Sequence, residues 1–256
     1  MATALSLAGK TALLTGGSNG IGAAIAHAYA VAGASVVFTY RKASDSAARV
    51  AAGMAALGGR VRAIQADLAQ QEAIDRLWQE ALELTGQIDV LVNNAGTITR
   101  SEFLQVTPGE LERVMAVNFY APWSLSRKLA EHLIGRKASG SILNISSVSA
   151  HFARSRMPHY QCSKAALNML TKSIAYELAP HGVRANAISA GLTQTNANRD
   201  QWEGNPALWR ERSSDIPLGR PGVPRDYAGL AVFLASDEAS WITGADIMVD
   251  GGSTVI

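Results

Sequence analysis

The segment Thr11-Ala-Leu-Leu-Thr-Gly-Gly-Ser-Asn-Gly-Ile-Gly22 decides the fold of this 256-residue chain. Its apolar start, Thr11–Leu14, predicts a buried strand, and the pattern Thr-Gly-x-x-x-Gly-x-Gly then leads into a helical stretch. In such a unit Gly16 permits a tight turn, Gly20 lets the backbone approach a pyrophosphate, and Gly22 lets helix and strand pack closely. The free N–H groups and the dipole at the helix start favour phosphate. The segment therefore predicts a dinucleotide-binding site.

The same glycines fit a second motif. Gly16, Ser18 and Gly20 match Gly-x-Ser-x-Gly, the nucleophile elbow of serine hydrolases. That fold needs earlier strands to supply an oxyanion loop, and only fifteen residues precede Gly16. We therefore favour the dinucleotide site over a hydrolase.

Short β-branched runs alternate with longer helical stretches along the whole chain. Strands that are apolar throughout and separated by helices indicate a parallel sheet covered on both faces. With right-handed crossovers this is an α/β fold, a single Rossmann-type doubly wound sheet, and we expect one domain over residues 1–256. The predicted strands are Thr11–Leu14, Ser35–Thr39, Val61–Gln65, Ile88–Val92, Ser141–Ile145, Arg184–Ile188 and Ile247–Val249. The predicted helices are Ile21–Ala32, Asp45–Leu57, Glu72–Leu84, Gly109–Ile134, Tyr160–Leu178 and Arg225–Ala235.

One long irregular stretch, Leu192–Arg220, interrupts this alternation. It contains Gly204, Pro206, Pro217 and Gly219. Loops of that length inside a compact domain usually serve a function. We expect a substrate lid at about 192–220 with a short helix of its own.

Composition and charge argue against several classes of protein. The net charge is +2 with interspersed charges, so neither nucleic acid nor a membrane surface is an expected partner. The single Cys162 excludes an internal disulfide and suits a reducing cytoplasm. Met1–Ser6 does not have the pattern of a signal peptide, and no run of 18 apolar residues predicts a membrane span. The five histidines are not spaced as metal ligands, so no metal is expected.

Tyr160 and Lys164 are the strongest chemical signal in the middle of the chain, and Ser147 lies thirteen residues before the tyrosine. A free tyrosine has a pKa of about 10, whereas a general acid/base works best near the operating pH. A lysine at i+4 on a helix lies on the same face, one turn away. Its charge at about 4–5 Å would lower the pKa of the phenol by ~2–3 units. With the glycine loop, this pair predicts hydride transfer coupled to proton transfer by the tyrosine.

The residues after the second predicted strand bear on the choice of dinucleotide. Dinucleotide-binding folds often place Asp or Glu there, on the 2′-hydroxyl of the ribose. This chain instead has Tyr40, Arg41 and Lys42, while Asp45 falls on the next predicted helix. Arg41 can bind a 2′-phosphate through its guanidinium, although Asn19 offers no second basic group. We predict a preference for NADP(H), with NAD(H) possible; the alternative is that Arg41 is a solvated loop residue.

In their order and spacing these motifs resemble the short-chain dehydrogenase/reductases, in the single-domain branch of that family. The resemblance covers nearly the whole chain and includes one departure, Ala190 before Gly191 where the family usually has proline. Losing the proline frees φ at that position, so we expect a more mobile loop over the nicotinamide. The matching segments are Thr15–Gly22, Asp67-Leu68, Asn93-Asn-Ala-Gly96, Asn118, Ser147, Tyr160, Lys164, Ile242-Thr-Gly and Val249-Asp-Gly-Gly252.

The resemblance implies roles for the catalytic residues. Tyr160 would give a proton to a ketone or take one from an alcohol. Ser147, rather than Ser146, would polarise the carbonyl oxygen. Lys164 would bind the nicotinamide ribose and acidify Tyr160, and Asn118 would hold a water that relays protons.

The resemblance also implies a set of cofactor-binding residues. Asp67 and Leu68 would lie by the adenine, Asn94 and Gly96 by the adenosine ribose, and Thr195 by the nicotinamide amide. The full predicted set is Gly16, Ser18, Asn19, Gly20, Ile21, Gly22, Tyr40, Arg41, Asp67, Leu68, Asn94, Ala95, Gly96, Tyr160, Lys164, Gly191, Thr193 and Thr195.

Several other side chains could act at this site. His151 and His159 flank the Tyr160 segment and could contact substrate or simply fill the loop. Cys162 is expected to pack in the helix rather than to act as a nucleophile. Trp202 and Trp209 could stack on a substrate or close over the cofactor.

The expected activity is NAD(P)(H)-dependent interconversion of a secondary alcohol or sugar hydroxyl and its carbonyl. The C-terminal half resembles bacterial sugar dehydrogenases and 3-oxoacyl-thioester reductases, so a 3-oxoacyl-thioester or other ketone reductase is an alternative. A non-catalytic dinucleotide-binding regulator is a second alternative, of another class. The family implies a homotetramer, and we expect the protein in the cytoplasm. A sugar or polyol substrate is favoured by the polar lid residues Thr195, Asn196, Asn198, Arg199, Asp200 and Glu203.

Overall fold

Seven parallel strands form one sheet in the order β3-β2-β1-β4-β5-β6-β7. The computed structural model describes residues 5–56 and 59–255. The doubly wound α/β fold expected from the sequence is confirmed, with the reversal of strand order between β1 and β4. The strands are β1 (Thr11–Leu14), β2 (Ser35–Tyr40), β3 (Val61–Gln65), β4 (Val90–Asn93), β5 (Gly140–Ser147), β6 (Val183–Ala190) and β7 (Asp246–Val249).

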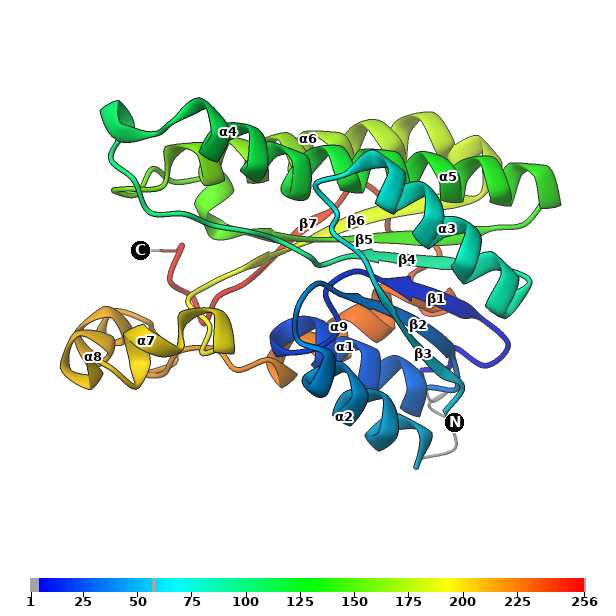
Figure 1. Cartoon of the computed structure of the whole chain (residues 1–256), viewed down its shortest axis with the longest axis horizontal. Coiled ribbons are helices and arrows are strands. Elements are labelled where there is room, and N and C mark those ends of the chain that lie inside the picture. Colours follow the sequence, from blue (N-terminus) through cyan, green and yellow to red (C-terminus); the bar gives the residue numbers. More distant parts are fainter. Residues whose placement is uncertain (1–4, 57–58, 256) are drawn as a thin grey trace.

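Helices cover both faces of this sheet (Figure 1). One face carries α1 (Gly20–Val31), α2 (Ser44–Ala55) and α9 (Arg225–Ala235), and the other carries α3 (Gln71–Thr85), α4 (Pro108–Met115), α5 (Ala121–Arg136) and α6 (Pro158–Leu178). No helix among residues 5–56 and 59–255 is long and apolar enough to cross a bilayer.

The strands supply side chains to both layers because successive residues point to opposite faces. In β1, Ala12 and Leu14 pack in the cluster that contains α1 and α9, whereas Leu13 packs in the cluster beneath α3, α5 and α6. Val36 and Val37 of β2 divide in the same way. Strands buried on both sides explain the continuous apolar runs of the sequence.

The predicted helix Gly109–Ile134 is wrong in one respect. It consists of α4 and α5 with a π-helical turn, Ala116–Tyr120, between them. Such a turn inserts one residue into the helical register and is frequent at functional sites. It contains Asn118. The other differences are at element ends: β4 begins at Val90 rather than Ile88, and α2 ends at Ala55, while the predicted end at Leu57 lies outside the described residues.

The predicted lid contains two helices rather than one. After β6 the chain forms a 3-10 turn (Asn196–Asn198), α7 (Arg199–Trp202) and α8 (Pro206–Ser214). Asn205 caps α8, since its side chain accepts a hydrogen bond from Leu208 N at 3.1 Å.

The two stems of this segment are paired. Thr193 and Gly222 form a parallel bridge, and Gly222 N donates to Leu192 O at 2.9 Å. Gln194 N donates to Gly222 O at 2.9 Å. The segment therefore begins and ends at paired positions, and Leu218 N also joins it to the C-terminal segment through Gly251 O at 3.1 Å.

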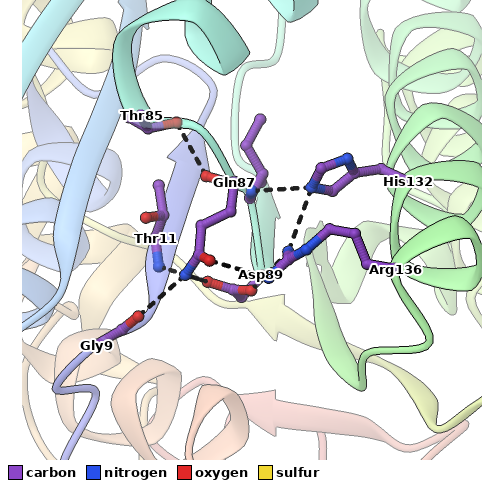
Figure 2. A network of polar contacts seen from close by, with 8 residues as sticks. Gly9, Thr11, Thr85, Gln87, Asp89, His132 and Arg136 are labelled. Atoms are coloured by element: carbon purple, nitrogen blue, oxygen red, sulfur yellow. Dashed lines mark hydrogen bonds and ion pairs between the residues drawn. The ribbon is translucent and has the colours of Figure 1, made fainter.

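A polar network lies at the amino-terminal end of the parallel strands, where β1 and β4 begin (Figure 2). The Asp89 carboxylate accepts from Thr11 N at 2.9 Å, from Gln87 Nε2 at 3.0 Å and from Arg136 Nη1 at 3.1 Å. Arg136 also donates to Gln87 Oε1 at 2.9 Å. These bonds tie the starts of two central strands to the end of α5.

His132 belongs to the same network (Figure 2). Its Nε2 accepts from Ile88 N at 3.3 Å, so this nitrogen must be unprotonated for the bond to exist. Burial and then the charge of Arg136 lower the pKa of His132, and Asp89 only partly opposes them. The network therefore favours neutral imidazole.

Candidate active site

The glycine loop between β1 and α1 is closely packed. A Cβ on Gly22 would lie 2.3 Å from Gly16 O and 2.4 Å from Asn94 Nδ2, so only glycine fits. Gly16 and Gly20 adopt φ of +71° and +57°, the region that favours glycine. The predicted roles of Gly16 in the turn and Gly22 in close packing agree with this geometry.

A fourth glycine was not singled out from the sequence. A Cβ on Gly17 would lie 2.6 Å from Phe38 Cβ of β2. Ser18 is buried, and Asn19 precedes α1 with extended backbone and no side-chain capping bond. The Asn19 side chain therefore does not occupy the N–H groups at the start of α1, the position where a phosphate is favoured.

Asn94 and Thr15 join the glycine loop to the segment after β4. Asn94 Nδ2 donates to Thr15 O at 2.9 Å and to Gly16 O at 3.0 Å. The Thr15 hydroxyl accepts from Asn94 N and Ala95 N, both at 3.0 Å. The amide of Asn94, predicted to contact the ribose, is thus engaged in fixing the loop, and its segment is brought beside the glycines.

A cavity of about 650 Å³ opens beside the ends of β2 and β3. It is lined by Arg41, Lys42, Asp67 and Arg113, among others. The Asp67 carboxylate accepts two bonds from Arg113 Nη2, at 2.9 and 3.1 Å. Burial raises the pKa of Asp67, but bonds from Ala69 N and Arg113, with the charge of Arg41, outweigh it and leave the pKa below its ordinary value.

The structure therefore brings the predicted residues Arg41 and Asp67 to one cavity and adds Arg113. No pattern in the sequence indicated Arg113, which lies 46 residues from its partner. Tyr40 is partly buried against the core, and Leu68 is a core residue on the α3 side.

Ser147 and Tyr160 meet at the carboxyl end of β5. The Ser147 hydroxyl lies close enough to the phenol of Tyr160 to act on its pKa, and Ser147 Oγ accepts from Ser149 N at 3.1 Å. Ser146 points elsewhere, because adjacent strand residues face opposite sides, and its hydroxyl lies 3.5 Å from Lys164 O. The structure thus brings Ser147, and not Ser146, to the tyrosine.

The expected lowering of the Tyr160 pKa is wrong for the chain without cofactor. Burial raises the pKa of the phenol, and the bond with Ser147 only partly offsets it. Lys164 Nζ lies 5.9 Å from the centre of the Tyr160 ring and donates to Ile145 O at 2.8 Å. Burial also lowers the pKa of Lys164, to about 8. The i+4 spacing is as predicted, but loss of water affects both groups more than their attraction does.

Asn118 is fully buried within the π-helical turn. Its Oδ1 accepts from Thr97 N at 2.8 Å, and its Nδ2 donates to Thr97 O and Ser163 Oγ, both at 3.0 Å. Ser163 Oγ in turn donates to Tyr160 O at 2.7 Å. Asn118 therefore links the segment after β4 to the first turns of α6, which carry Tyr160 and Lys164.

Three predicted residues after β6 have structural partners. A Cβ on Gly191 would lie 2.6 Å from Asp250 Cα, so packing alone requires glycine there. Thr193 Oγ1 donates to Gly191 O at 2.9 Å and bonds with the hydroxyl of Tyr227. Thr195 lies across the glycine loop, 3.7 Å from where a Cβ on Gly20 would stand. Of the three, only Thr195 faces the loop. Ala190 is the last residue of β6, paired with β5 and β7.

The histidines and Cys162 have other surroundings. His159 is buried and its Nε2 lies 2.6 Å from Thr99 Oγ1, while His151 Nε2 lies 2.8 Å from Asp246 Oδ2. Cys162 is exposed, so its predicted packing role is wrong: α6 turns this side chain to the surface. Within the described part of the chain, no three His, Cys, Asp or Glu side chains are grouped to hold a metal.

The tryptophans of the lid segment are used differently from each other. Trp202 Nε1 donates to Thr195 O at 2.9 Å, which ties α7 to the residue beside the glycine loop. Trp209 is buried. Both contribute to the packing of the segment.

Comparison with known proteins gives matches over nearly the full length. A family model described as enoyl-(acyl carrier protein) reductase matches residues 16–254. The chain is 37% identical over 249 residues to 3beta-hydroxysteroid dehydrogenase 1 of Eggerthella lenta, covering 97% of this chain and 95% of the relative. It is also 37% identical over 250 residues to an L-rhamnose 1-dehydrogenase (NAD(P)(+)) of Sphingomonas sp., covering 97% and 98%.

Solved structures agree. A short-chain type dehydrogenase/reductase from Mycobacterium marinum superposes with a TM-score of 0.92 at 36% identity, covering 98% of both chains. A gluconate 5-dehydrogenase from Burkholderia cenocepacia, in complex with NADP and tartrate, gives 0.91 at 32% identity, also covering 98% of both. Full-length sequence matches and a shared sheet topology lead to one conclusion: the chain belongs to the short-chain dehydrogenase/reductase family of NAD(P)-dependent oxidoreductases.

Proposed function

We propose that this chain interconverts a secondary alcohol or sugar hydroxyl and the corresponding carbonyl, with Tyr160 as the acid/base. The observation that carries the proposal is the position of the Ser147 hydroxyl beside the phenol of Tyr160, which lies one turn of α6 from Lys164. A substrate oxygen placed between the two hydroxyls would receive a hydrogen bond from each. In reduction Tyr160 gives its proton to that oxygen; in oxidation it takes the proton away.

The residues fit a nicotinamide dinucleotide. In the glycine loop some positions leave no room for a Cβ and others hold positive φ. The backbone of the loop is therefore free of side chains near the start of α1, where phosphates are favoured. The bound dinucleotide would supply or accept the hydride. Lys164 would hold the nicotinamide ribose through its ammonium, and Thr195, across the glycine loop, would lie by the carboxamide.

Burial alone leaves Tyr160 a poor base, because it raises the pKa of the phenol. In oxidation, therefore, a positive charge must enter the site to favour the phenolate. We propose that the oxidised nicotinamide and the protonated Lys164 supply it together. Reduction has no such requirement, since the neutral phenol is the proton donor.

Protons would leave Tyr160 by way of Lys164 and a water held near Asn118. The point where a side chain on Gly96 would begin lies 3.5 Å from Asn118 Oδ1 and 3.7 Å from Lys164 Nζ. Glycine places no side chain beside these two atoms, and we propose that a water held next to them bonds to both. Asn118 Oδ1 has a second lone pair available beyond its bond from Thr97 N.

We propose that NADP(H) is preferred over NAD(H). Arg41 lines the cavity beside Asp67, and no carboxylate stands between the end of β2 and the start of α2 to accept a 2′-hydroxyl. Changing Tyr40→Asp and Arg41→Ala together should reverse the ratio of kcat/KM for the two cofactors. A wild-type enzyme with a tenfold preference for NAD(H) would show that Arg41 only faces solvent.

The proposed substrate is a sugar or polyol, supported by the polar residues of the lid segment and by relatives named for rhamnose and gluconate. Ketone reduction, including 3-oxoacyl thioesters, is the alternative within the same chemistry. A panel of sugars, polyols and ketoesters, followed by NADPH absorbance, decides between them. A protein that binds the dinucleotide but turns over no compound would instead be a regulator.

Tyr160→Phe tests the mechanism. The variant keeps the ring and its packing but loses the proton, so kcat should fall at least about 100-fold, whereas the Kd for NADP(H) should barely change. A variant with nearly normal turnover would exclude Tyr160 as the acid/base. Tyr29→Phe, which removes a phenol hydroxyl from α1 on the other face of the sheet, is the matched control and should leave kcat unchanged.

We further propose one domain, a mobile lid at 192–220 and a cytoplasmic homotetramer. Large apolar side chains on the surfaces of the π-helical turn, α5 and α6 support assembly, since a monomer would leave them in water. They are Tyr120, Trp123, Met169 and Tyr176. Light scattering after gel filtration tests the tetramer, and hydrogen exchange of residues 192–220 with and without ligands tests the lid.

A further inference from the structure

Tyr160 lies in the first turn of α6, which begins at Pro158. The N–H groups of a first helical turn have no partner within the helix, and the side chain of the preceding residue often binds one of them. Met157 occupies that position here and makes no side-chain capping bond. The turn that carries Tyr160 therefore depends on other contacts to hold it in place.

Both sequence neighbours of Tyr160 make such contacts, each with a different segment. His159 Nε2 lies 2.6 Å from Thr99 Oγ1, in the segment after β4. Gln161 Nε2 donates to Phe152 O at 3.1 Å, in the loop between β5 and α6. These two segments and the start of α6 lie at the same end of the sheet (Figure 1). Tyr160 is thus held between two anchors.

The two anchors differ in burial. His159 is 3% exposed and its bond with Thr99 is partly buried, whereas the bond between Gln161 and Phe152 is exposed. Breaking a buried bond leaves a polar group without water, so it costs more than breaking an exposed one. The bond between His159 and Thr99 is therefore the stronger anchor.

The second ring nitrogen of His159 shows that packing alone does not explain this side chain. Its Nδ1 is buried and has no hydrogen-bond partner in the part of the chain that the structure describes. A buried polar atom without a partner lowers stability, and an apolar side chain of similar size would avoid that cost. What the ring does provide is a fixed bond to Thr99 beside Tyr160.

We propose that His159 and Thr99 are positioning residues, whose bond sets the place of the Tyr160 phenol relative to the substrate. The segment of Thr99 is itself fixed, since Thr97 N donates to Asn118 Oδ1 at 2.8 Å. The inference rests on the proposed function, because it takes Tyr160 as the acid/base. A misplacement of about 1 Å at a reacting group can lower a rate about 100-fold, so loss of this bond should impair turnover before it impairs the fold.

Four single variants and one double variant test the proposal. Thr99→Val removes the hydroxyl and His159→Leu removes the ring nitrogens, and each should lower kcat about 10-fold or more while the Kd for NADP(H) stays within about 2-fold. Thr99→Ser and His159→Gln keep groups that can form the bond and should recover most of kcat. The double variant Thr99→Val with His159→Leu should have the kcat of the single variants, because all three lose the same bond.

Urea unfolding separates positioning from stability. The double variant leaves no unpaired partner, so it should unfold near the wild-type midpoint although its turnover is low. Thr171→Val is the matched control, the same change further along α6. Its buried hydroxyl accepts from Asn144 Nδ2 at 2.8 Å and donates to Leu167 O at 2.9 Å. This variant should be less stable than wild type and keep its kcat.

Turnover is measured with L-rhamnose, D-glucitol and ethyl acetoacetate, one compound of each class in the panel. A normal kcat in Thr99→Val, or two single losses that multiply in the double variant, would overturn the inference and leave the role of Tyr160 intact. Absence of turnover of all three compounds by the wild type would count against the proposed function instead.

Hydrogen exchange then decides the inference without any substrate. In Thr99→Val the amides of the first turn of α6 should exchange about 10-fold faster than in wild type, whereas those near Thr171 should be unchanged. An unchanged rate in the first turn would show that the bond between His159 and Thr99 does not hold Tyr160 in place.

Discussion

Replacing Lys164 by methionine should stabilise the cofactor-free protein at neutral pH, although it removes a residue of the active site. Lys164 is 4% exposed, and burial lowers its pKa from 10.5 to about 8. Below pH 8 folding therefore buries an ammonium at a cost of about 3 kcal/mol, from ~1.4 kcal/mol per pKa unit. Methionine loses the bond to Ile145 O, worth about 1 kcal/mol. We expect a net gain of about 2 kcal/mol at pH 7.

The gain should disappear in alkali. Because the folded pKa lies below the unfolded one, the unfolded chain binds more protons between pH 8 and 10.5, and stability rises with pH in that window. The cost of Lys164 is fully present below pH 8 and absent above pH 10.5. At pH 10 it is about 1 kcal/mol, similar to the lost hydrogen bond. The two proteins should then have nearly equal free energies of unfolding.

Urea unfolding followed by tryptophan fluorescence at pH 7, 8, 9 and 10 measures this difference. Lys172→Met, an exposed lysine on the same helix, is the control and should show a small difference that does not vary with pH. A Lys164→Met protein less stable than wild type at pH 7, or one whose difference is constant from pH 7 to 10, would refute the reasoning. The variant should nevertheless lose turnover, so a gain in stability would accompany a loss of function.

Two further changes test the glycine loop and the polar network of Asp89, His132 and Arg136 at the opposite ends of the strands. Gly22→Ala should lower the free energy of unfolding by at least about 1–3 kcal/mol and abolish NADP(H) binding, because the new Cβ would lie 2.3 Å from Gly16 O. Gly53→Ala is the control, since this glycine of α2 has open space around it. In the same urea titration it should be neutral or stabilising. His132 has a lowered pKa, so its contribution to stability is present above the unfolded pKa and lost as pH falls through the folded one. His132→Gln should therefore give a shallower loss of unfolding free energy between pH 6.5 and 5 than wild type. An unchanged slope would show that protonation of His132 does not destabilise the fold.

The sequence predicted the centre of the sheet well because both faces of β1, β2 and β4 are buried, which leaves a nearly uninterrupted apolar run at each of these strands. It could not predict the π-helical turn at Ala116–Tyr120, whose residues fit an ordinary helical pattern. That turn is stabilised by contacts of Asn118 with Thr97 and Ser163, which are distant in the chain. The partner of Asp67, Arg113, was missed for the same reason.

The pKa shifts of the site residues were harder to predict from sequence than the identity of those residues. The i+4 spacing of Tyr160 and Lys164 is a property of the helix and was read from sequence. Whether Lys164 Nζ approaches the phenol or the carbonyl of Ile145 depends on how deeply the helix packs on β5. Burial also shifts the pKa of Tyr160 and the pKa of Lys164 separately, and the sequence pattern does not show how deeply each side chain is buried.

The paired stems of the segment after β6 make it an exchangeable unit. Thr193 and Gly222 are already held together, so the seven-stranded sheet does not depend on α7 and α8, which lie between them. A longer or shorter excursion would change the entropy of loop closure only slowly, by about 0.6 kcal/mol per doubling of length. Evolution could therefore replace α7 and α8 by insertion or recombination without refolding the sheet. A protein engineer could do the same, transplanting this segment from a relative to obtain a new substrate preference on an unchanged hydride-transfer centre.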